Sequence, residues 1–404
     1  MRRGGRTSFR KGWAALLVLL FLSLPLSASI IIPGSSGAYK HLLDPVTVMD
    51  PARRGMGGAG IALYDTPDAL YLNPASLASR DFKISVPYLT VTLYNPYELY
   101  QSGVLETLID DGYEEALDEL VDFVDSYGLY SKLAQIDAGL TLYSGGFGFG
   151  LAVQDTVHLY SPGNFVSTQV VNELNVLLTL GYGHRLYLSR YVTLDIGASV
   201  SLSYLAYNEA VSAAGIADNY SDIADYLLTG TPFFAGCALP VKVGATLNLP
   251  FNFSLGATLE NINGTYYMKE HENIESLWDN LISDPEFKFS TDMDLSVGFA
   301  WSFDMISRVI KPTIACDIDD VVGLFNDGLS KRNILGHLRA GAEIEIFTFI
   351  SLRAGLYDSY WTLGAGLDFK LFRVDLAYFN EEYGSTYGEK GLSGLTVRVK
   401  VGLE

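Results

Sequence analysis

The sequence is poor in charged residues and in cysteine, and positive charge is especially scarce. Only 18% of the 404 residues are charged, and 27 Lys and Arg stand against 46 Asp and Glu, which gives a net charge of −19. Because such an acidic chain would repel nucleic-acid phosphates, we exclude nucleic acid as a partner. Two cysteines, Cys237 and Cys316, are too few for a disulfide framework.

Long apolar runs are missing beyond the N-terminus. A basic stretch over residues 2–11, the apolar run Ala14–Leu24 and the small residues Leu26-Ser27-Ala28 together predict a signal peptide over residues 1–29. Its removal takes away five positive charges, so the net charge falls from −19 to −24. The alternative is an uncleaved anchor, but the run is shorter than the ~20 residues of a spanning helix.

Catalytic and metal-binding motifs are also lacking. The sequence has no G-x-S-x-G motif, no Cys/His pair at nucleophile spacing, and five scattered histidines. Asp317-Ile318-Asp319-Asp320 is acidic but lacks the glycine and terminal glutamate of a calcium-binding EF-hand loop. The sequence therefore predicts a protein that is not an enzyme, with no metal site and no cofactor.

One glycine cluster matches a nucleotide-binding motif by its letters alone. Residues 55–60 read G-x-G-x-x-G, but Pro51-Ala52-Arg53-Arg54 before them is not a buried strand, and no βαβ pattern follows. The glycines instead indicate close packing of one backbone segment against another, which a missing side chain permits.

Apolar and aromatic residues are abundant: 49% of the chain is hydrophobic, with 26 Tyr, 21 Phe and 40 Gly. The chain has a positive mean hydropathy but no apolar helix after the N-terminus. We therefore expect its apolar residues to alternate with polar residues along β-strands. Tyr191–Tyr204 is the clearest case, with Val, Leu, Ile, Ala and Tyr on one face and Thr, Asp, Gly and Ser on the other. Alternation of this kind is typical of a membrane barrel.

About fourteen such runs follow residue 81, and an even number is what a closed bacterial barrel requires. Long and short connections alternate between them, as expected for external loops and periplasmic turns. A soluble β-sandwich is the rival fold, but the polar faces here carry Gly, Ser and Thr with few charges, which suits a lumen. The predicted strands are 82–95, 134–144, 146–160, 165–184, 191–207, 235–249, 252–268, 291–304, 308–320, 336–347, 349–358, 360–370, 372–383 and 393–404.

Five basic residues in the last strands fall on the lumen side of the alternation. Acidic residues of the same strands share that face, so the structural interpretation is a network of salt bridges between strands or to a plug. The functional alternative is a wall that attracts a substrate carboxylate. The five residues are Arg339, Arg353, Arg373, Arg398 and Lys400.

Residues 53–78 resemble the N-terminal plug region of the FadL/TodX family of outer-membrane transporters for hydrophobic compounds. They are also similar to PorV-type proteins and spirochaete members of the same group. Such proteins commonly read G-M-G-G-A-G-x-A, a short acidic link and A-x-x-x-N-P-A-x-L. The residues that carry the resemblance here include Gly55, Gly57, Gly58, Gly60, Asp65, Asp68, Asn73, Pro74 and Ala75.

The resemblance implies an all-β fold: a membrane-spanning antiparallel β-barrel of 14 strands with an N-terminal hatch in its lumen. We accordingly expect a signal peptide over residues 1–29, a hatch or plug over 30–81 and the barrel over 82–404. It also implies lateral release of ligand near the third strand, where a bulge at Gly148 and Gly150 would open the wall. The terminal aromatic residue common in outer-membrane proteins is replaced by Leu403-Glu404.

The function expected from the resemblance is passive uptake of long-chain fatty acids or other hydrophobic small molecules across the outer membrane of a diderm bacterium. The partners would be the ligand and outer-membrane lipid. Two alternatives stay open: a PorV-like adaptor barrel that binds a secretion partner, and a structural or surface-exposed barrel.

Overall fold

The computed structural model describes most of the chain after residue 45. The described residues are 46–63, 66, 68–79, 83–110, 119, 123, 130–160, 169–208, 211–212, 233–271, 285–303, 310–347, 349–369, 371–383, 388 and 390–403. The predicted signal peptide lies outside them.

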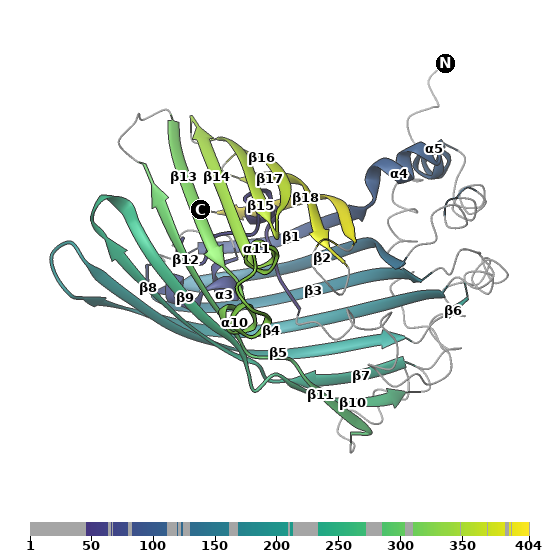
Figure 1. The fold of residues 1–404 in the computed structure, drawn as a ribbon, viewed down its shortest axis with the longest axis horizontal. Coiled ribbons are helices and arrows are strands. Elements are labelled where there is room, and N and C mark those ends of the chain that lie inside the picture. Colours follow the sequence, from purple (N-terminus) through teal and green to yellow (C-terminus); the bar gives the residue numbers. More distant parts are fainter. Residues whose placement is uncertain are drawn as a thin grey trace.

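The strands form one antiparallel sheet that closes on itself (Figure 1). The first strand pairs with the last, Leu89 opposite Val399, and on its other edge with the second strand, Leu89 opposite Ala138. Closure leaves the sheet without an edge strand, which a bilayer requires because unpaired backbone groups find no water there. The strands are β1 Lys83–Tyr94, β2 Tyr130–Ser144, β3 Phe147–Tyr160, β4 Gln169–Tyr187, β5 Thr193–Asn208, β6 Val211–Ser212, β7 Phe233–Ala238, β8 Val241–Leu249, β9 Phe253–Ile262, β10 Thr265–His271, β11 Phe287–Ser290, β12 Asp294–Ser302, β13 Ile310–Ile318, β14 Leu338–Ile346, β15 Ile350–Tyr357, β16 Tyr360–Asp368, β17 Phe372–Glu382 and β18 Gly391–Leu403.

The barrel wall has 14 strands, which confirms the number predicted from the sequence. Three wall strands are each broken in two, so that β7 is continued by β8, β9 by β10, and β11 by β12. The first two breaks fall inside the predicted runs 235–249 and 252–268, whereas the predicted run 291–304 begins after β11 and omits it. Proline has no N–H to donate, and Pro240 stands at the first break. Asn261 and Asn263 adopt positive φ at the second. Among the described residues, the short β6 pairs with β4.

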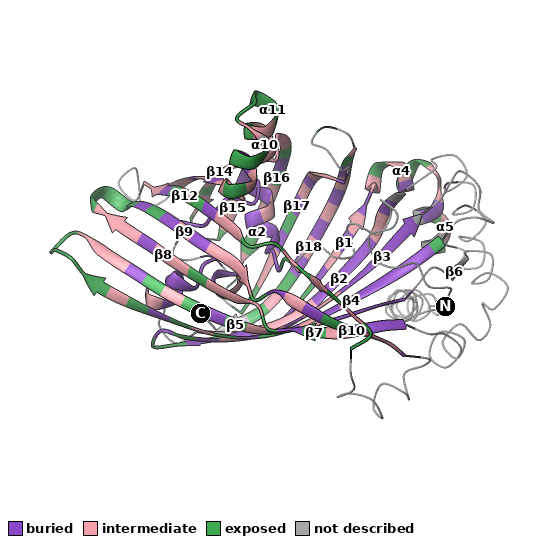
Figure 2. Ribbon diagram, turned by 60° about the horizontal axis from the view of Figure 1, so that its bottom comes forward, coloured by how far each residue is buried: buried purple, intermediate pink, exposed green. Residues whose placement is uncertain are grey.

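The outer face of the barrel is apolar, and the inner face is polar. Along β5, Ile196, Val200 and Leu202 are exposed, whereas Asp195 and Ser199 are buried inside. Figure 2 shows the same alternation as bands along many strands. A closed sheet with an apolar outer surface and a polar inner surface has the form of a membrane-spanning barrel.

The two ends of the barrel differ in their connections. One end, here the turn end, carries the short connections 145–146, 188–192, 250–252, 303–309, 347–349 and 369–371. The other, the loop end, carries the long connections together with the two-residue turn Asp358-Ser359. The described helices of the loop end are α4 Pro96–Gln101, α5 Val104–Asp110, α10 Val321–Asp327 and α11 Lys331–Gly336. None of the helices among the described residues is long and apolar enough to cross a membrane.

We predict that Leu363, an exposed residue near the middle of β16, faces lipid. Replacing it with arginine should destabilise the barrel folded in lipid vesicles, lowering its free energy of unfolding by about 2–4 kcal/mol, because a charge would enter the hydrocarbon layer. The apolar control Leu363→Met should cost less than about 1.5 kcal/mol. If denaturant titrations find the two variants equally stable, this face of the barrel does not contact lipid.

Candidate functional site

The lumen of the barrel is occupied by the segment 46–79, called the plug below. It comprises the helices α2 Pro51–Gly55 and α3 Ala69–Leu72 and the 3-10 helix η2 Pro74–Ser79. Asp50 caps α2 by accepting a hydrogen bond from the Ala52 N–H at 2.8 Å, and Pro51 takes the first helical position, where its missing N–H costs nothing. These local signals explain why so short a helix begins where it does.

A buried ion pair joins the two halves of the plug. Arg53 Nε donates to Asp68 Oδ2 at 2.6 Å, and the side chains of both residues are almost completely buried. The Asp50 N–H donates to the same carboxylate oxygen at 3.2 Å, and Arg53 Nη1 donates to the Gly58 carbonyl at 3.1 Å. Asp68, one of the residues that carry the family resemblance, therefore holds the plug in one piece.

Asp317 of β13 fixes the glycine turn of the plug to the wall. Its Oδ2 accepts hydrogen bonds from the Gly60 and Ile61 N–H groups, at 2.6 Å and 3.0 Å, and the residue is buried. A carboxylate that accepts from two successive backbone amides is held by charge-assisted bonds, which are stronger than neutral ones. Parity places Asp317 on the lumen face, but nothing in the sequence alone identifies its partner.

Asn73 connects the two halves of the plug to each other and to strand β8 of the wall. Its Nδ2 donates to the Ile61 carbonyl at 2.7 Å and to Thr246 Oγ1 of β8 at 3.0 Å, while its Oδ1 accepts from the Ala75 N–H at 3.0 Å. A fully buried amide whose donors and acceptor are matched in this way orients the turn that begins η2.

Two further ion pairs hold the first helix of the plug. Arg398 of β18 reaches Asp50 at 2.9 Å, and Arg54 reaches Glu381 of β17 at 3.1 Å. The Arg54 guanidinium also lies 4.1 Å from the ring centre of Phe379, where the ring face attracts a cation. The plug is therefore attached to the wall by contacts to β8, β13, β17 and β18, all of them non-covalent.

Glycines make the closest contacts between plug and wall. Gly57 has a φ of +65°, and a Cβ on it would lie 2.3 Å from the Leu356 carbonyl oxygen. The wall also has glycines where the plug lies against it, and their missing side chains leave room for the plug. They are Gly148, Gly150, Gly181, Gly183, Gly197, Gly244, Gly256, Gly341, Gly355 and Gly364.

The bulge expected at Gly148 and Gly150 is wrong. Strand β3 pairs in continuous register with β4, and its pairing with β2 shifts only between Lys132 and Ala134. A Cβ at Gly148 would meet Leu77 at 2.9 Å, and one at Gly150 would meet the Tyr71 hydroxyl at 2.3 Å. Both positions are glycine because the plug lies against them. Asp65 of the resemblance lies outside the described residues, and Pro74 and Ala75 lie in η2 against Gly183 and Gly197.

The four lumen arginines are ion-paired, which favours the salt-bridge interpretation over a free anion-binding wall. Arg353 contacts Glu343 and Asp375, and Arg373 contacts Asp375 and Asp368. Arg339 pairs with Asp319, and Arg398 pairs with the plug as described above. Lys400, the fifth basic residue, lies beside Arg398 and Asp50 at a small cavity of about 10 Å³.

Above the plug, toward the loop end, the lumen holds a polar cavity of about 220 Å³, called the vestibule below. It is bordered by the start of the plug, by β2, β3 and β4, and by the ends of β15 and β17. Its lining is Val46, Thr47, Met49, Arg54, Lys132, Gln135, Gln154, Thr156, Glu173, Tyr357, Asp358, Glu381, Glu382 and Tyr383. None of the five basic residues singled out from the sequence is among them.

An apolar cluster lies beside the vestibule on the lumen side of β4, β5, β7, β10 and β11. Tyr207 packs on Phe234 with ring centres 5.6 Å apart, and Tyr266 stacks on Phe289 at 4.9 Å. We call it the lumen apolar cluster; its members are Val171, Leu205, Tyr207, Phe234, Ala238, Tyr266 and Met268, with Phe287 and Phe289 packed against them. It adjoins the vestibule because Tyr207 is the cross-strand partner of Glu173. Neither the vestibule nor the cluster was identified from the sequence.

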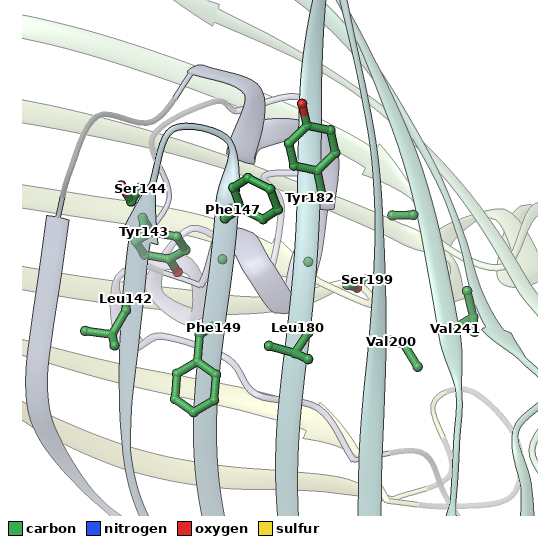
Figure 3. A pocket seen from close by; sticks show the side chains of 13 residues that line it. Leu142, Tyr143, Ser144, Phe147, Phe149, Leu180, Tyr182, Ser199, Val200 and Val241 are labelled. Carbon is green, nitrogen blue, oxygen red and sulfur yellow. The ribbon is translucent and has the colours of Figure 1, made fainter.

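A second hollow, of about 720 Å³, lies on the wall across β2–β5 and β8 near the turn end. Figure 3 shows its side chains, among them Leu142, Phe149, Leu180 and Val200. These residues belong to the outward, apolar face, so the hollow faces lipid.

Within the described part of the chain, no group of three or more His, Cys, Asp or Glu side chains is arranged to hold a metal ion.

No family model matches the chain, and no curated protein does so either. Similar solved structures include the Pseudomonas putida toluene transporter TodX, with 14% identity and a TM-score of 0.47 over 89% of this chain and 99% of that chain. The CymD monoaromatic hydrocarbon channel has 11% identity and a TM-score of 0.46 over 88% and 97%. A Pseudomonas aeruginosa FadL homologue has 12% identity and a TM-score of 0.42 over 89% and 98%. The closed barrel follows from the strand pairings alone.

Substitution of Gly57 should prevent the plug from seating. Gly57→Ala must place a Cβ against the Leu356 carbonyl, whereas Gly145→Ala, at a φ of +55°, meets nothing within 4 Å. Both variants carry left-handed backbone strain of about 1–2 kcal/mol, so their difference isolates the contact with the wall. Hydrogen exchange of the amides of residues 55–61 should accelerate in the first variant only. Equal protection in both would show that the plug does not depend on this contact.

Removing the two guanidinium groups that pair with Asp375 should weaken the barrel and spare transport. Arg353→Gln combined with Arg373→Gln leaves Asp375 buried without a cation, which should lower the free energy of unfolding by about 3–5 kcal/mol. We expect cells that carry this variant to take up oleate as the unaltered barrel does, once expression is matched. Lost uptake with unchanged stability would instead support the carboxylate-attracting wall.

Proposed function

We propose that the protein is a passive transporter that admits hydrophobic small molecules, long-chain fatty acids among them, across the outer membrane. The observation that carries the proposal is the lumen apolar cluster, a group of apolar and aromatic side chains packed inside a polar lumen, in a barrel whose plug is held by non-covalent contacts. Burial of a ligand's apolar tail there would contribute about 0.8 kcal/mol per CH₂ group. The sequence has no ATP-binding motif, so diffusion and plug movement drive transport.

Release through the wall beside β3 is supported by the thinness of the wall there. The plug residues Leu70 and Leu77 lie against the inner side of Gly148 and Gly181, and these two glycines also line the lipid-facing hollow. Only strand backbone separates the plug from lipid at these positions. In this mechanism, movement of the plug away from Gly148 and Gly150 frees the inner side of the wall for the ligand.

A PorV-like adaptor barrel is the second candidate, and the occupied lumen favours it. The plug fills the turn-end half, and the vestibule of about 220 Å³ is smaller than a long-chain fatty acid requires in full. An adaptor would use its loop end to bind a secreted protein, and exposed apolar side chains such as Phe325 and Leu329 lie there. A structural or surface-exposed barrel would fit the same features.

Uptake by whole cells separates these functions. A diderm strain without its own hydrophobic-compound transporters should accumulate labelled oleate or toluene several-fold faster with the barrel than with an empty vector. A porin expressed at the same level is the control for general leakiness. Uptake at the vector level, together with a secreted protein that copurifies with the barrel from outer membranes, would contradict transport and support the adaptor.

A further inference from the structure

The small cavity beside Lys400 lies at the seam between the plug and the wall, and we call it the seam cavity. Its volume of about 10 Å³ is room for about one water molecule. Both the plug and three strands of the wall contribute side chains to it. They are Val48, Asp50, Asp68 and Tyr71 of the plug, Tyr88 of β1, Thr141 of β2, and Arg398 and Lys400 of β18.

Three buried polar atoms at the seam cavity make no hydrogen bond to any other described residue. They are Oδ1 of Asp68 and the hydroxyl groups of Tyr71 and Tyr88. An unpaired buried hydroxyl or carboxylate oxygen is costly, and proteins pair such atoms with other protein groups or with ordered water. Three such atoms around a space of this size point to one shared ligand that forms hydrogen bonds.

The two tyrosine side chains are held at the cavity by their other contacts. The ring of Tyr88 lies against the Arg398 guanidinium, which is 4.2 Å from the ring centre. Lys242 Nζ donates to the Tyr71 carbonyl, and a Cβ at Gly150 would lie 2.3 Å from the Tyr71 hydroxyl. Tyr71 therefore lies close against β3 while its hydroxyl reaches the seam cavity.

The charges around the seam cavity favour a neutral ligand over an ion. Asp68 Oδ2 already accepts from Arg53 Nε at 2.6 Å, and Asp50 already pairs with Arg398 at 2.9 Å. A metal cation would have to compete with these arginines, and an anion would be repelled by the same two carboxylates. Water both donates and accepts, so it matches one carboxylate oxygen and two hydroxyl groups.

We propose that the seam cavity is a water-binding site, and that its single water molecule bridges the plug and β1. The water accepts hydrogen bonds from the Tyr71 and Tyr88 hydroxyls and donates one to Asp68 Oδ1. It holds α3 to the wall next to Gly150, where release beside β3 requires the plug to move away. Because any water molecule can re-form such a bridge, α3 can separate from β1 without leaving a hydroxyl unpaired.

Tyrosine-to-phenylalanine variants distinguish a bridging water from a dry cavity, because phenylalanine keeps the ring and removes only the hydroxyl. With the water present, Tyr71→Phe and Tyr88→Phe each remove one of its hydrogen bonds. Hydrogen exchange of the amides of residues 69–73, which are bonded within the plug, should then accelerate about three- to tenfold in either variant. In a dry cavity each change would remove an unpaired hydroxyl, and unchanged or slower exchange would overturn the proposal.

The double variant shows whether the two hydroxyls share one water. Its exchange should accelerate by less than the product of the two single effects, because the first substitution already weakens binding of the water that the second hydroxyl contacts. Acceleration by the full product would overturn a shared site. The matched control is Tyr94→Phe on the same strand as Tyr88. It removes a hydroxyl that donates directly to Gln135 at 3.1 Å, and it should leave exchange of these amides unchanged.

A high-resolution structure of the full-length barrel gives the direct check. We expect density for one water molecule within about 3.2 Å of Asp68 Oδ1 and of both tyrosine hydroxyls. A direct hydrogen bond between the two hydroxyls, or an ion in the seam cavity, would overturn the proposal. Neither result decides whether the barrel takes up oleate, which the uptake assay in cells tests by itself.

Discussion

The width of the barrel is the constraint on which the rest of the structure depends. A barrel of about eight strands is filled by its own side chains, whereas 14 strands enclose a lumen that side chains alone leave open. Here the plug fills that space with main chain, and buried N–H and C=O groups must find partners. The wall supplies them: Thr362 donates to the Gly55 carbonyl and accepts from the Gly57 N–H, both at 3.0 Å, and Ser254 donates to the Ala62 carbonyl at 2.8 Å. Small lumen residues follow from the same need, since backbone can approach backbone only where side chains are absent.

The alternation of apolar and polar residues sufficed to predict the barrel because lipid imposes it on every strand. Each predicted run corresponds to a wall strand, and the ends agree within a few residues for most of them, as for residues 82–95 against β1 Lys83–Tyr94. The breaks within the runs 235–249 and 252–268 were missed because a break such as that at Pro240 changes backbone pairing without disturbing the alternation, and β11 was left outside the run 291–304. The prediction of a bulge at Gly148 and Gly150 was wrong for a different reason. A glycine in a strand is compatible with a bulge or with a close neighbour, and only the path of the plug decides between them.

The site was predictable in its positions and not in its partners. Parity placed Arg398 and Asp317 on the lumen face, but their partners in the plug are 348 and 257 residues away in the chain. Such contacts depend on strand register and on the fold of the plug, neither of which a single sequence determines. The same holds for the vestibule: none of the five basic residues singled out from the sequence lines it, and its polar lining comes from the plug, from β2, β3 and β4, and from the ends of β15 and β17, which together form no sequence motif.

Transport through this barrel requires the plug to move. Asn73 and Thr246 join plug and wall, so Asn73→Cys with Thr246→Cys, in a chain whose Cys237 and Cys316 are replaced by serine, allows the two to be tied by a short thiol-specific, reducible crosslinker. Cellular uptake of labelled decanol, measured before and after crosslinking and again after reduction, tests the claim most directly. We predict that the tether abolishes uptake and that reduction restores it. Uptake that continues at the same rate with the plug tied to β8 would contradict a movable plug.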